Sequence, residues 1–349
     1  MAKMFVSGRH LIGIVLLCAF VVFTVTPAMA AGPLVLRFAA SDPEASTAPA
    51  MSIGMLCEQI TKLSKGELNA QPFYQSLGIE QQIATAVKSG SVDGGFTATA
   101  NLAPFTDAFL PFDLPLLYKN DKEAIETLEN HPAGKKAIAQ FEKDLGVKVL
   151  LLTSHTYDSA CSGKDLINRV KEVRVPDDIK GMKLRTASTP AEVSLLKAYG
   201  ANPTPIPYAQ VYSALQQGVV DGNAATPITP MAALKLYEVS KYYTALGFGF
   251  NILPIYINQK KFDSLTASQK KAVLDAAAMV KPLAGKWARD KADGAIAEFE
   301  KNGVHIYHPN KEEMAKWMAV REDVWKQIAE AFKGKIDLNV ANEIYKPRF

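Results

Sequence analysis

The sequence has few residues of the kinds that build disulfide frameworks or metal centres. Its 349 residues include 3 cysteines, 5 histidines and 3 tryptophans. Cys18 lies in an N-terminal apolar run, which leaves Cys57 and Cys161. Two cysteines cannot form a disulfide framework, and the sequence does not decide whether they pair or stay apart as small buried side chains. After the N-terminal segment, the four histidines are scattered along the chain, so we expect no metal site and no cofactor.

The common signatures of catalytic sites are also missing. The chain has no Gly-rich phosphate loop, no Gly-x-Ser-x-Gly elbow and no His-Glu-x-x-His motif. Ser194 and Lys197 have the spacing of a Ser-x-x-Lys pair, but the companion motifs of penicillin-binding enzymes are absent. We therefore expect a protein that is not an enzyme. One alternative stays open, an exported hydrolase or lyase that acts on a carboxylate substrate with Asp93, Asp221 or this Ser–Lys pair.

Charge of one sign is not in excess. Lys3 and Arg9 precede an apolar run, Leu11 to Val25, and Ala28-Met29-Ala30 follows, which is typical of a secretory signal peptide cleaved after Ala30. Residues 1–30 hold two of the 39 Lys and Arg residues, so their removal leaves 37 basic against 35 acidic residues. This balance, without a basic cluster, argues against a nucleic-acid partner. We expect an exported protein of the periplasm.

What the chain does contain is an alternation of strands and helices, which predicts an α/β fold with mostly parallel sheets. The stretch from Thr266 to Lys301 predicts one long helix, capped by Thr266 and Gln269, kinked at Pro282 and Gly285 and able to span two lobes. We expect lobe I at residues 31–155 plus about 250–285, and lobe II at 156–249 plus about 286–349. Further expected elements are strands at 33–41, 67–74, 92–96, 148–153, 182–186 and 219–220, and helices at 47–63, 79–89, 122–145, 209–217 and 314–332.

A short element occurs twice in the sequence. QQIATAVKSGSVDGG begins at Gln81, and AQVYSALQQGVVDGN begins at Ala209. In both copies a helix ends at a glycine suited to a left-handed conformation, Gly90 or Gly218. A short strand and an Asp-Gly pair follow, and we expect that pair to turn the chain at the carboxyl end of the strand. Because ligands bind at this edge of open α/β sheets, two facing copies predict a cleft.

Arg185 is a candidate binding residue, since it lies within a predicted strand just before a helix. Thr189 and Glu192 have the spacing of a capping box at the start of that helix. A guanidinium is costly to bury unless it meets an anion, and its planar fork suits a carboxylate. The helix N-terminus adds favourable potential for the same anion. By position alone, Arg185 either binds an anionic ligand or belongs to a structural salt bridge or a solvated strand end.

The segment from Val173 to Val239 resembles the solute-binding proteins of TRAP transporters, the tripartite ATP-independent periplasmic family. The matching motifs are KLRT, GANPTPIPYAQVYSALQQGVVDG and KLYEV, and upstream LRFAAS, FYQSLGIEQQIATAVKSGSVDGGFTAT and FDLPLLYKN. The match covers nearly the whole chain after the leader. It implies a two-lobed, periplasmic-binding-protein-like fold with a hinge. Such a protein closes over an organic acid and delivers it to the small and large membrane subunits of the transporter.

The same resemblance implies the pocket. The strand arginine that clamps the ligand carboxylate in the family matches Arg185, and the aromatic residue after Pro-Thr-Pro matches Tyr208. Many members place Asn before the proline that follows Asp-Gly, whereas here Thr226 precedes Pro227 in a run that is one residue longer. The ligand-binding residues that we expect are Arg185, Tyr208, Thr226, Asn223, Ser41, Thr97, Thr99 and Phe248.

Two charges found in acid-sugar binders of the family are missing. Their second arginine aligns with Ala160, and a glutamate of the FTAT loop aligns with Ala98. A second carboxylate on the ligand would lack a cation, so we expect a small monocarboxylate or keto acid, with any apolar or aromatic tail beside Tyr208, Phe96 or Phe248. We expect a monomer. The sequence does not identify the acid, establish the oligomeric state or speak to a signalling role.

Overall fold

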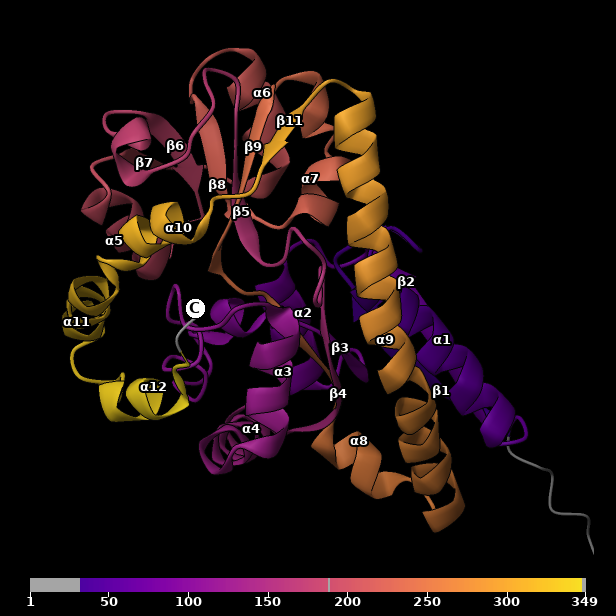
Figure 1. Cartoon of the computed structure of the whole chain (residues 1–349). Helices are drawn as coiled ribbons and strands as arrows, with labels where there is room; N and C mark the ends of the chain where they lie inside the picture. Colours follow the sequence, from indigo (N-terminus) through magenta and orange to yellow (C-terminus); the bar gives the residue numbers. More distant parts are fainter. Residues whose placement is uncertain (1–31, 188, 347–349) are drawn as a thin grey trace, which may run out of the picture. The chain divides into compact units, whose positions relative to one another are not determined.

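Two mixed β-sheets carry the fold (Figure 1). The structure is a computed structural model that describes residues 32–187 and 189–346, and the predicted signal peptide lies outside the described residues. The chain from Pro33 onward forms one compact unit. Sheet A has the strand order β2-β1-β3-β10-β4, and sheet B has the order β11-β9-β5-β8-β6-β7. The strands of sheet A are β1 (Leu34–Ala40), β2 (Leu68–Tyr74), β3 (Gly94–Phe96), β4 (Val147–Ser154) and β10 (Ile252–Asn258). The strands of sheet B are β5 (Lys164–Asn168), β6 (Lys183–Thr186), β7 (Asn202–Pro205), β8 (Gly222–Thr226), β9 (Tyr242–Gly249) and β11 (His305–Tyr307).

Parallel pairs are the majority, as expected, but four of the nine strand pairs are antiparallel. β1 is parallel to β2 and β3, β6 is parallel to β7 and β8, and β11 is parallel to β9, but β10 and β5 are antiparallel to both of their neighbours. The reason lies in the connections between the sheets. β9 ends at Gly249 in sheet B, and β10 begins at Ile252 in sheet A, so the chain crosses from one sheet to the other without the helix that would return it parallel.

Helices cover the two sheets. Around sheet A lie α1 (Ala48–Leu63), α2 (Glu80–Ser89), α3 (Asp121–Asn130), α4 (Pro132–Leu145) and α8 (Gln259–Ser264), with the 3₁₀ turn η1 (Thr99–Leu102). Around sheet B lie α5 (Pro190–Ala198), α6 (Val211–Gln216) and α7 (Ile228–Ala233), with η2 (Pro176–Ile179), η3 (Tyr208–Gln210) and η4 (Leu236–Glu238). The predicted helix 122–145 is two helices, because Pro132 places the preceding His131 in an extended conformation, with φ −73° and ψ 140°.

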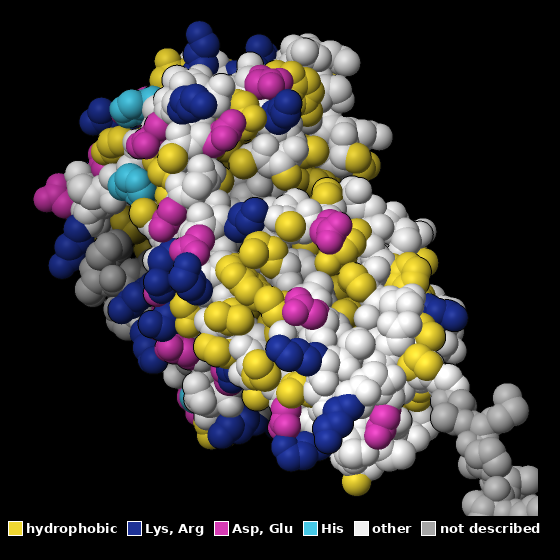
Figure 2. All heavy atoms as spheres, turned by 90° about the vertical axis from the view of Figure 1, so that its right-hand side faces the viewer, with side chains coloured by type: hydrophobic (Ala, Val, Ile, Leu, Met, Phe, Trp, Pro, Cys, Tyr) yellow, Lys and Arg dark blue, Asp and Glu magenta, His cyan; other side chains and the backbone are white. Residues whose placement is uncertain are grey.

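The long predicted helix is confirmed as α9 (Ala267–Lys301), with its capping box at Thr266 and Gln269. It contacts α1 and β4 on the sheet A side, and α7 and β11 on the sheet B side. Figure 2 views the molecule from the side on which α9 lies and shows hydrophobic side chains interspersed with charged ones. Leu274, Met279 and Leu283 of α9 are exposed. One face of this helix is therefore solvated, while alanines and Phe299 on its other face enter the cores.

The C-terminal helices form an arm that contacts both halves of the molecule. They are α10 (Lys311–Met318), α11 (Arg321–Ala331) and α12 (Leu338–Ile344), so the single helix expected at 314–332 is wrong. The break between α10 and α11 lets two buried tryptophans bond different parts of the chain. Trp317 Nε1 donates to the Arg174 carbonyl at 2.8 Å, and Trp325 Nε1 donates to the Pro115 carbonyl at 2.7 Å.

The repeated sequence element builds the same structure in each sheet. β3 pairs in parallel with β1 at Phe38–Gly94, and β8 pairs in parallel with β6 at Leu184–Gly222. Each helix does end at its left-handed glycine, with φ 80° at Gly90 and 73° at Gly218. However, the Asp-Gly pairs begin the strands instead of turning the chain after them, and no strand forms at 219–220. The glycines at 94 and 222 are needed for close packing instead, since a Cβ on Gly94 would lie 2.4 Å from the Phe38 ring.

Candidate functional site

The guanidinium of Arg185 is buried with hydrogen-bond capacity unused. The residue is 4% exposed. Its Nε donates to the Ile206 carbonyl at 2.9 Å, and Nη1 donates to Asn223 Oδ1 at 3.2 Å and Thr226 Oγ1 at 3.1 Å. Among the residues that the structure describes, it forms no ion pair, and the two N–H groups of Nη2 have no hydrogen-bond partner. Burial lowers the pKa of Arg185, and the charge of Glu192 offsets only part of this shift. A buried cation with open donors is suited to an anion.

Asn223 and Thr226 lie on β8 beside β6, which explains their contact with Arg185. Arg185 pairs with Asn223 in the parallel register of the two strands. Thr226 Oγ1 also donates to Asn223 Oδ1 at 3.3 Å. Because Oδ1 accepts both bonds, the Asn223 amide is fixed with Nδ2 as a donor, and this atom is buried without a partner in the described part of the chain. The two residues therefore hold the guanidinium and add further polar groups beside it.

A buried ion pair supports the loop that follows Arg185. Glu192 Oε1 lies 2.6 Å from Lys164 Nζ, with side-chain exposures of 13% and 11%. Glu192 Oε2 accepts hydrogen bonds from Thr186 Oγ1 at 2.8 Å and from the Ala187 N–H at 2.9 Å. Burial alone would raise the pKa of Glu192, but the charge and hydrogen bond of Lys164, the hydrogen bond from Thr186 and the charge of Arg185 together lower it. Thr189 caps α5 as expected, but the Glu192 carboxylate bonds to the end of β6, so only half of the predicted capping box forms.

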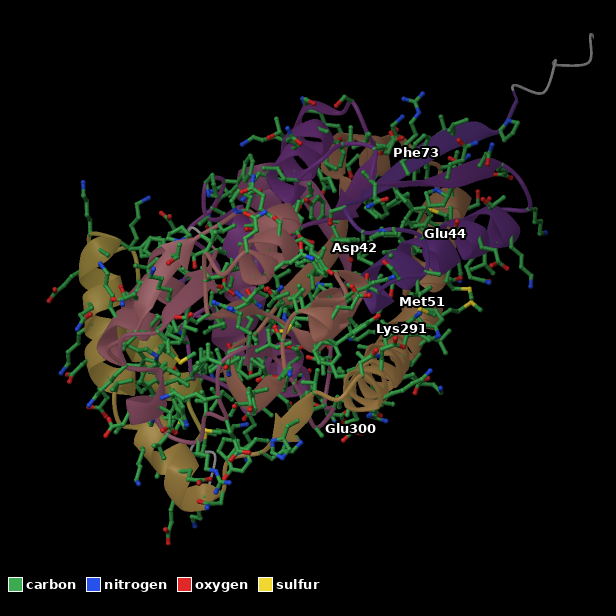
Figure 3. All side chains as sticks on the ribbon, turned by 90° about the horizontal axis from the view of Figure 1, so that it is seen from above. Asp42, Glu44, Met51, Phe73, Lys291 and Glu300 are labelled. Atoms are coloured by element: carbon green, nitrogen blue, oxygen red, sulfur yellow. The ribbon has the colours of Figure 1, made fainter. Side chains whose placement is uncertain are left out.

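The charge of Asp42, on the sheet A side, affects the pKa of Tyr208 on the sheet B side. It follows Ser41 at the end of β1 and is labelled in Figure 3 toward the middle of the view. Burial raises the pKa of Tyr208, the charge of Asp42 raises it further, and the charge of Arg185 lowers it. Tyr208 is 40% exposed, and its hydroxyl donates to the Pro230 carbonyl at 2.7 Å. The charges of Asp42 from the sheet A side and of Arg185 from the sheet B side therefore both act on Tyr208.

Three other predicted residues have internal partners of their own. Thr97 Oγ1 bonds with Tyr256 Oη at 2.7 Å and donates to the Glu80 carbonyl at 3.2 Å. Thr99 Oγ1 donates to Asp113 Oδ1 at 2.5 Å. Phe248 packs against Tyr199 and Trp317, in the same core cluster as Leu184.

Phe248 therefore does not share a face of sheet B with Arg185. Since neighbouring side chains alternate along a strand, Arg185 points to the face opposite to Leu184. Phe248 instead lines a cavity of about 310 Å³ between the two halves of the molecule, together with Asp113, Lys164 and Phe332. The structure brings together Arg185, Asn223, Thr226 and Tyr208, with Ser41 next to Asp42. It does not bring Thr97, Thr99 or Phe248 to the guanidinium.

Sequence reasoning missed three polar residues of this region. His155 and Asp42 each follow a strand that ends near the other sheet, and Glu80 is the first residue of α2. The Glu80 carboxylate accepts hydrogen bonds from the Ala98 N–H at 2.6 Å and from Asn101 Nδ2 at 2.9 Å. An acidic group therefore lies next to Ala98 after all, supplied by a different element. The sequence signal that could have pointed to these three residues is their position, because each lies at or just after the end of a predicted strand or at the start of a predicted helix.

The remaining candidates for chemistry do not form a site. Asp93 and Asp221 lie in different sheets, where each accepts a backbone N–H, from Arg37 at 2.8 Å and from Lys183 at 2.9 Å. Cys57 and Cys161 are both buried and unpaired. Within residues 32–187 and 189–346, no group of three or more His, Cys, Asp or Glu residues could hold a metal ion, and no helix is long and apolar enough to cross a membrane.

Comparisons with known proteins identify the family. Residues 40–331 match the model of the DctP family, described as bacterial extracellular solute-binding protein, family 7. The 2,3-diketo-L-gulonate-binding periplasmic protein YiaO of Escherichia coli is 29% identical over 72% of this chain and 74% of its own. The C4-dicarboxylate-binding periplasmic protein DctP of Rhodobacter capsulatus is 27% identical over 78% of this chain and 80% of its own. The sugar acid binding protein DctPAm of Advenella mimigardefordensis, solved with galactonate, superposes with a TM-score of 0.76 at 26% identity, covering 90% of this chain and 97% of its own. These matches confirm the two-lobed α/β fold, and the chain belongs to the DctP family of TRAP solute-binding proteins.

Proposed function

We propose that this protein captures a small organic acid in the periplasm and delivers it to the membrane subunits of a TRAP transporter. In this proposal the ligand carboxylate binds Arg185, and Tyr208, Asn223, Thr226 and Ser41 line the same cleft. The main support is that the Arg185 guanidinium is 4% exposed, makes its hydrogen bonds to neutral oxygens, and has no carboxylate partner among the described residues. Burying such a cation is costly, and an anionic ligand would compensate for that cost.

The proposed mechanism is movement of two lobes about a hinge, without catalysis. We propose the lobe boundaries stated above, with the crossings at residues 155–163 and 250–251 and helix α9 as the connections. A ligand favours the closed form only through contacts that the open form lacks. Arg185 comes from one side of the cleft, and Ser41 and Asp42 come from the other. An acid that touches both sides would therefore favour closure.

We further propose that the preferred ligand is a monocarboxylate or keto acid. Ala160 leaves the second cationic position of acid-sugar binders empty, and the nearby Lys164 is already bound to Glu192 at 2.6 Å. Asp42 and Glu80 would repel a second carboxylate on the sheet A side. The named ligands of the relatives include both monocarboxylate sugar acids and C4-dicarboxylates, so the two classes have to be compared directly.

Calorimetry on the purified mature protein tests these proposals. We expect Arg185→Ala to weaken binding of every acid by about 2–5 kcal/mol, because it leaves the carboxylate without its cation. Arg185→Lys keeps the charge but loses the planar fork, and it should recover only part of that loss. Arg169→Ala is the matched control, because Arg169 lies 3.9 Å from Asp221 at the far end of β8. Unchanged affinity in Arg185→Ala would refute the proposal that Arg185 binds the ligand carboxylate. A clear preference for a C4-dicarboxylate over monocarboxylates of similar length would refute the proposed ligand class.

A further inference from the structure

His155 is a buried side chain whose imidazole has no hydrogen-bond partner in the part of the chain that the structure describes. The residue is 5% exposed, and its Nδ1 is enclosed without a partner. Its backbone is anchored, since the His155 carbonyl accepts a hydrogen bond from Thr229 Oγ1 at 3.5 Å. A buried polar group without a partner is destabilising and calls for an explanation. Unlike a typical core histidine, this ring has no internal bond to account for its position.

The position of His155 links it to the proposed cleft. It directly follows β4 of sheet A, in the segment that crosses to β5 of sheet B. Its partner Thr229 lies on α7, three residues after Thr226, whose hydroxyl bonds Arg185. Burial lowers the pKa of His155, and the charge of Asp42 acts in the opposite direction. Asp42 acts in the same way on Tyr208, next to Arg185. The charge of Asp42 thus acts on both His155 and Tyr208.

We infer that His155 is a specificity-determining residue whose imidazole hydrogen-bonds an oxygen of the ligand other than the carboxylate held by Arg185. A neutral imidazole carries one donor and one acceptor nitrogen, so it can bind an oxo or a hydroxyl oxygen, whereas it gains little from a plain hydrocarbon chain. The inference rests on the proposed function and refines it, because it selects acids that carry a second oxygen over acids of equal length that do not.

The test compares four acids of the same chain length, 2-oxobutanoate, 2-hydroxybutanoate, 3-hydroxybutanoate and butanoate. Binding of each to wild type, His155→Leu, His155→Gln and His155→Asn is measured by calorimetry. In His155→Leu we expect the affinity for the best oxygenated acid to fall about five- to hundred-fold, while the affinity for butanoate changes less than about threefold. Gln and Asn carry an amide near the place of Nε2 or Nδ1, so one of these variants should restore part of the loss.

Thermal unfolding without ligand separates this role from a structural one. Because the ring makes no internal hydrogen bond, His155→Leu should be as stable as wild type or more stable. His305→Asn is the control, since His305 is exposed and lies 3.0 Å from Glu172. A His155→Leu variant that loses all four acids equally, or that loses none, would overturn the inference while Arg185→Ala still tests the proposed function. If none of the four acids binds wild type, the ligand class and this inference both fail.

Discussion

At the scale of single residues, this protein buries polar groups in two different ways. Asp113 is a carboxyl group whose pKa burial raises from 3.8 to about 7, although Thr99 and the charge of Lys164 lower it. Asp121 has its pKa raised by burial to about 6, while Thr156 donates to its Oδ2. Arg185 and His155, by contrast, keep hydrogen-bond capacity that no described residue uses. The two buried carboxyl groups affect the stability of the fold, whereas our proposals assign the unused hydrogen-bond capacity of Arg185 and His155 to a ligand.

The carboxyl of Asp113 predicts a pH dependence of stability. Its pKa is higher in the folded than in the unfolded chain, so between pH 4 and 7 the folded state binds more protons, and the free energy of unfolding falls as the pH rises. Asp121 contributes with the same sign. Since one pKa unit corresponds to about 1.4 kcal/mol, we expect Asp113→Asn to be more stable than wild type by about 2–4 kcal/mol at pH 8.

Urea unfolding at pH 5 and pH 8 measures this effect. The gain of Asp113→Asn should be much smaller at pH 5, where the wild-type carboxyl is mostly protonated. Asp263→Asn serves as the control, because Asp263 is an exposed aspartate on helix α8. If the free energy of unfolding of Asp113→Asn differed from that of wild type by the same amount at both pH values, the raised pKa of Asp113 would be contradicted.

At the scale of elements, the duplicated segment explains how the two sheets are built. Asp93 and Asp221 each accept the N–H of the neighbouring strand, and each donates its own N–H back to that strand, to Arg37 and Lys183 at 2.9 and 2.8 Å. The equivalent pairs place Arg185 of β6 where Ala39 lies in β1. The same scaffold therefore carries the proposed anion-binding residue in only one of its two copies.

The two aspartates should have structural roles of unequal strength. The Asp93 side chain is 10% exposed and lies 3.2 Å from Lys261, whereas the Asp221 side chain is 28% exposed and lies 3.9 Å from Arg169. We expect Asp93→Ala to lower the free energy of unfolding by about 2–3 kcal/mol, and Asp221→Ala by about 1 kcal/mol. Denaturant unfolding measures both, with the Asn variants as controls that keep an acceptor. If Asp93→Ala and Asp221→Ala lowered the free energy of unfolding equally, the expected difference between the two aspartates would be refuted.

At the scale of the whole molecule, α9 and the C-terminal arm each contact elements of both sheets. α9 is one helix over 35 residues with Pro282 inside it. A proline in a helix removes one backbone hydrogen bond and crowds the preceding turn. The neighbouring Gly285 is close to Tyr157, since a Cβ there would lie 2.9 Å from the tyrosine ring. The middle of α9 thus contains a residue that cannot complete the backbone hydrogen bonds, close to a glycine that packs against Tyr157 of the crossing segment.

Replacing this proline should strengthen the helix. Pro282→Ala restores the missing N–H, and because Pro282 is exposed the change leaves no cavity. We expect the free energy of unfolding to rise by about 1–2 kcal/mol, less than the full helix penalty of proline because the unfolded chain also gains freedom. The measurement is urea unfolding, and the control is Lys286→Ala, a substitution at an exposed residue of the same helix. A Pro282→Ala variant less stable than wild type would show that the proline is required by the packing of α9.

The sequence alone determined the local structure where a physical signal is short-range. Glycines that end helices, the cap of α9 and the apolar runs of β1, β2 and β4 are properties of a few neighbouring residues, and the structure confirms them. The two-lobed fold was likewise predicted, because the motifs around Arg185 resemble those of a two-lobed family. Arg185 was singled out as a candidate by the cost of placing a cation within a strand, and its role stays a prediction.

Only the tertiary structure decided which distant residues meet. The antiparallel strands β5 and β10 depend on where the chain crosses between sheets, which no local pattern records. Phe248 and Arg185 lie on opposite faces of one sheet, and Glu80 reaches Ala98 from another element, because side-chain direction depends on strand register and helix placement. His155 gained its importance in the same way, since a polar side chain becomes informative only when the surrounding fold buries it and leaves it without a partner.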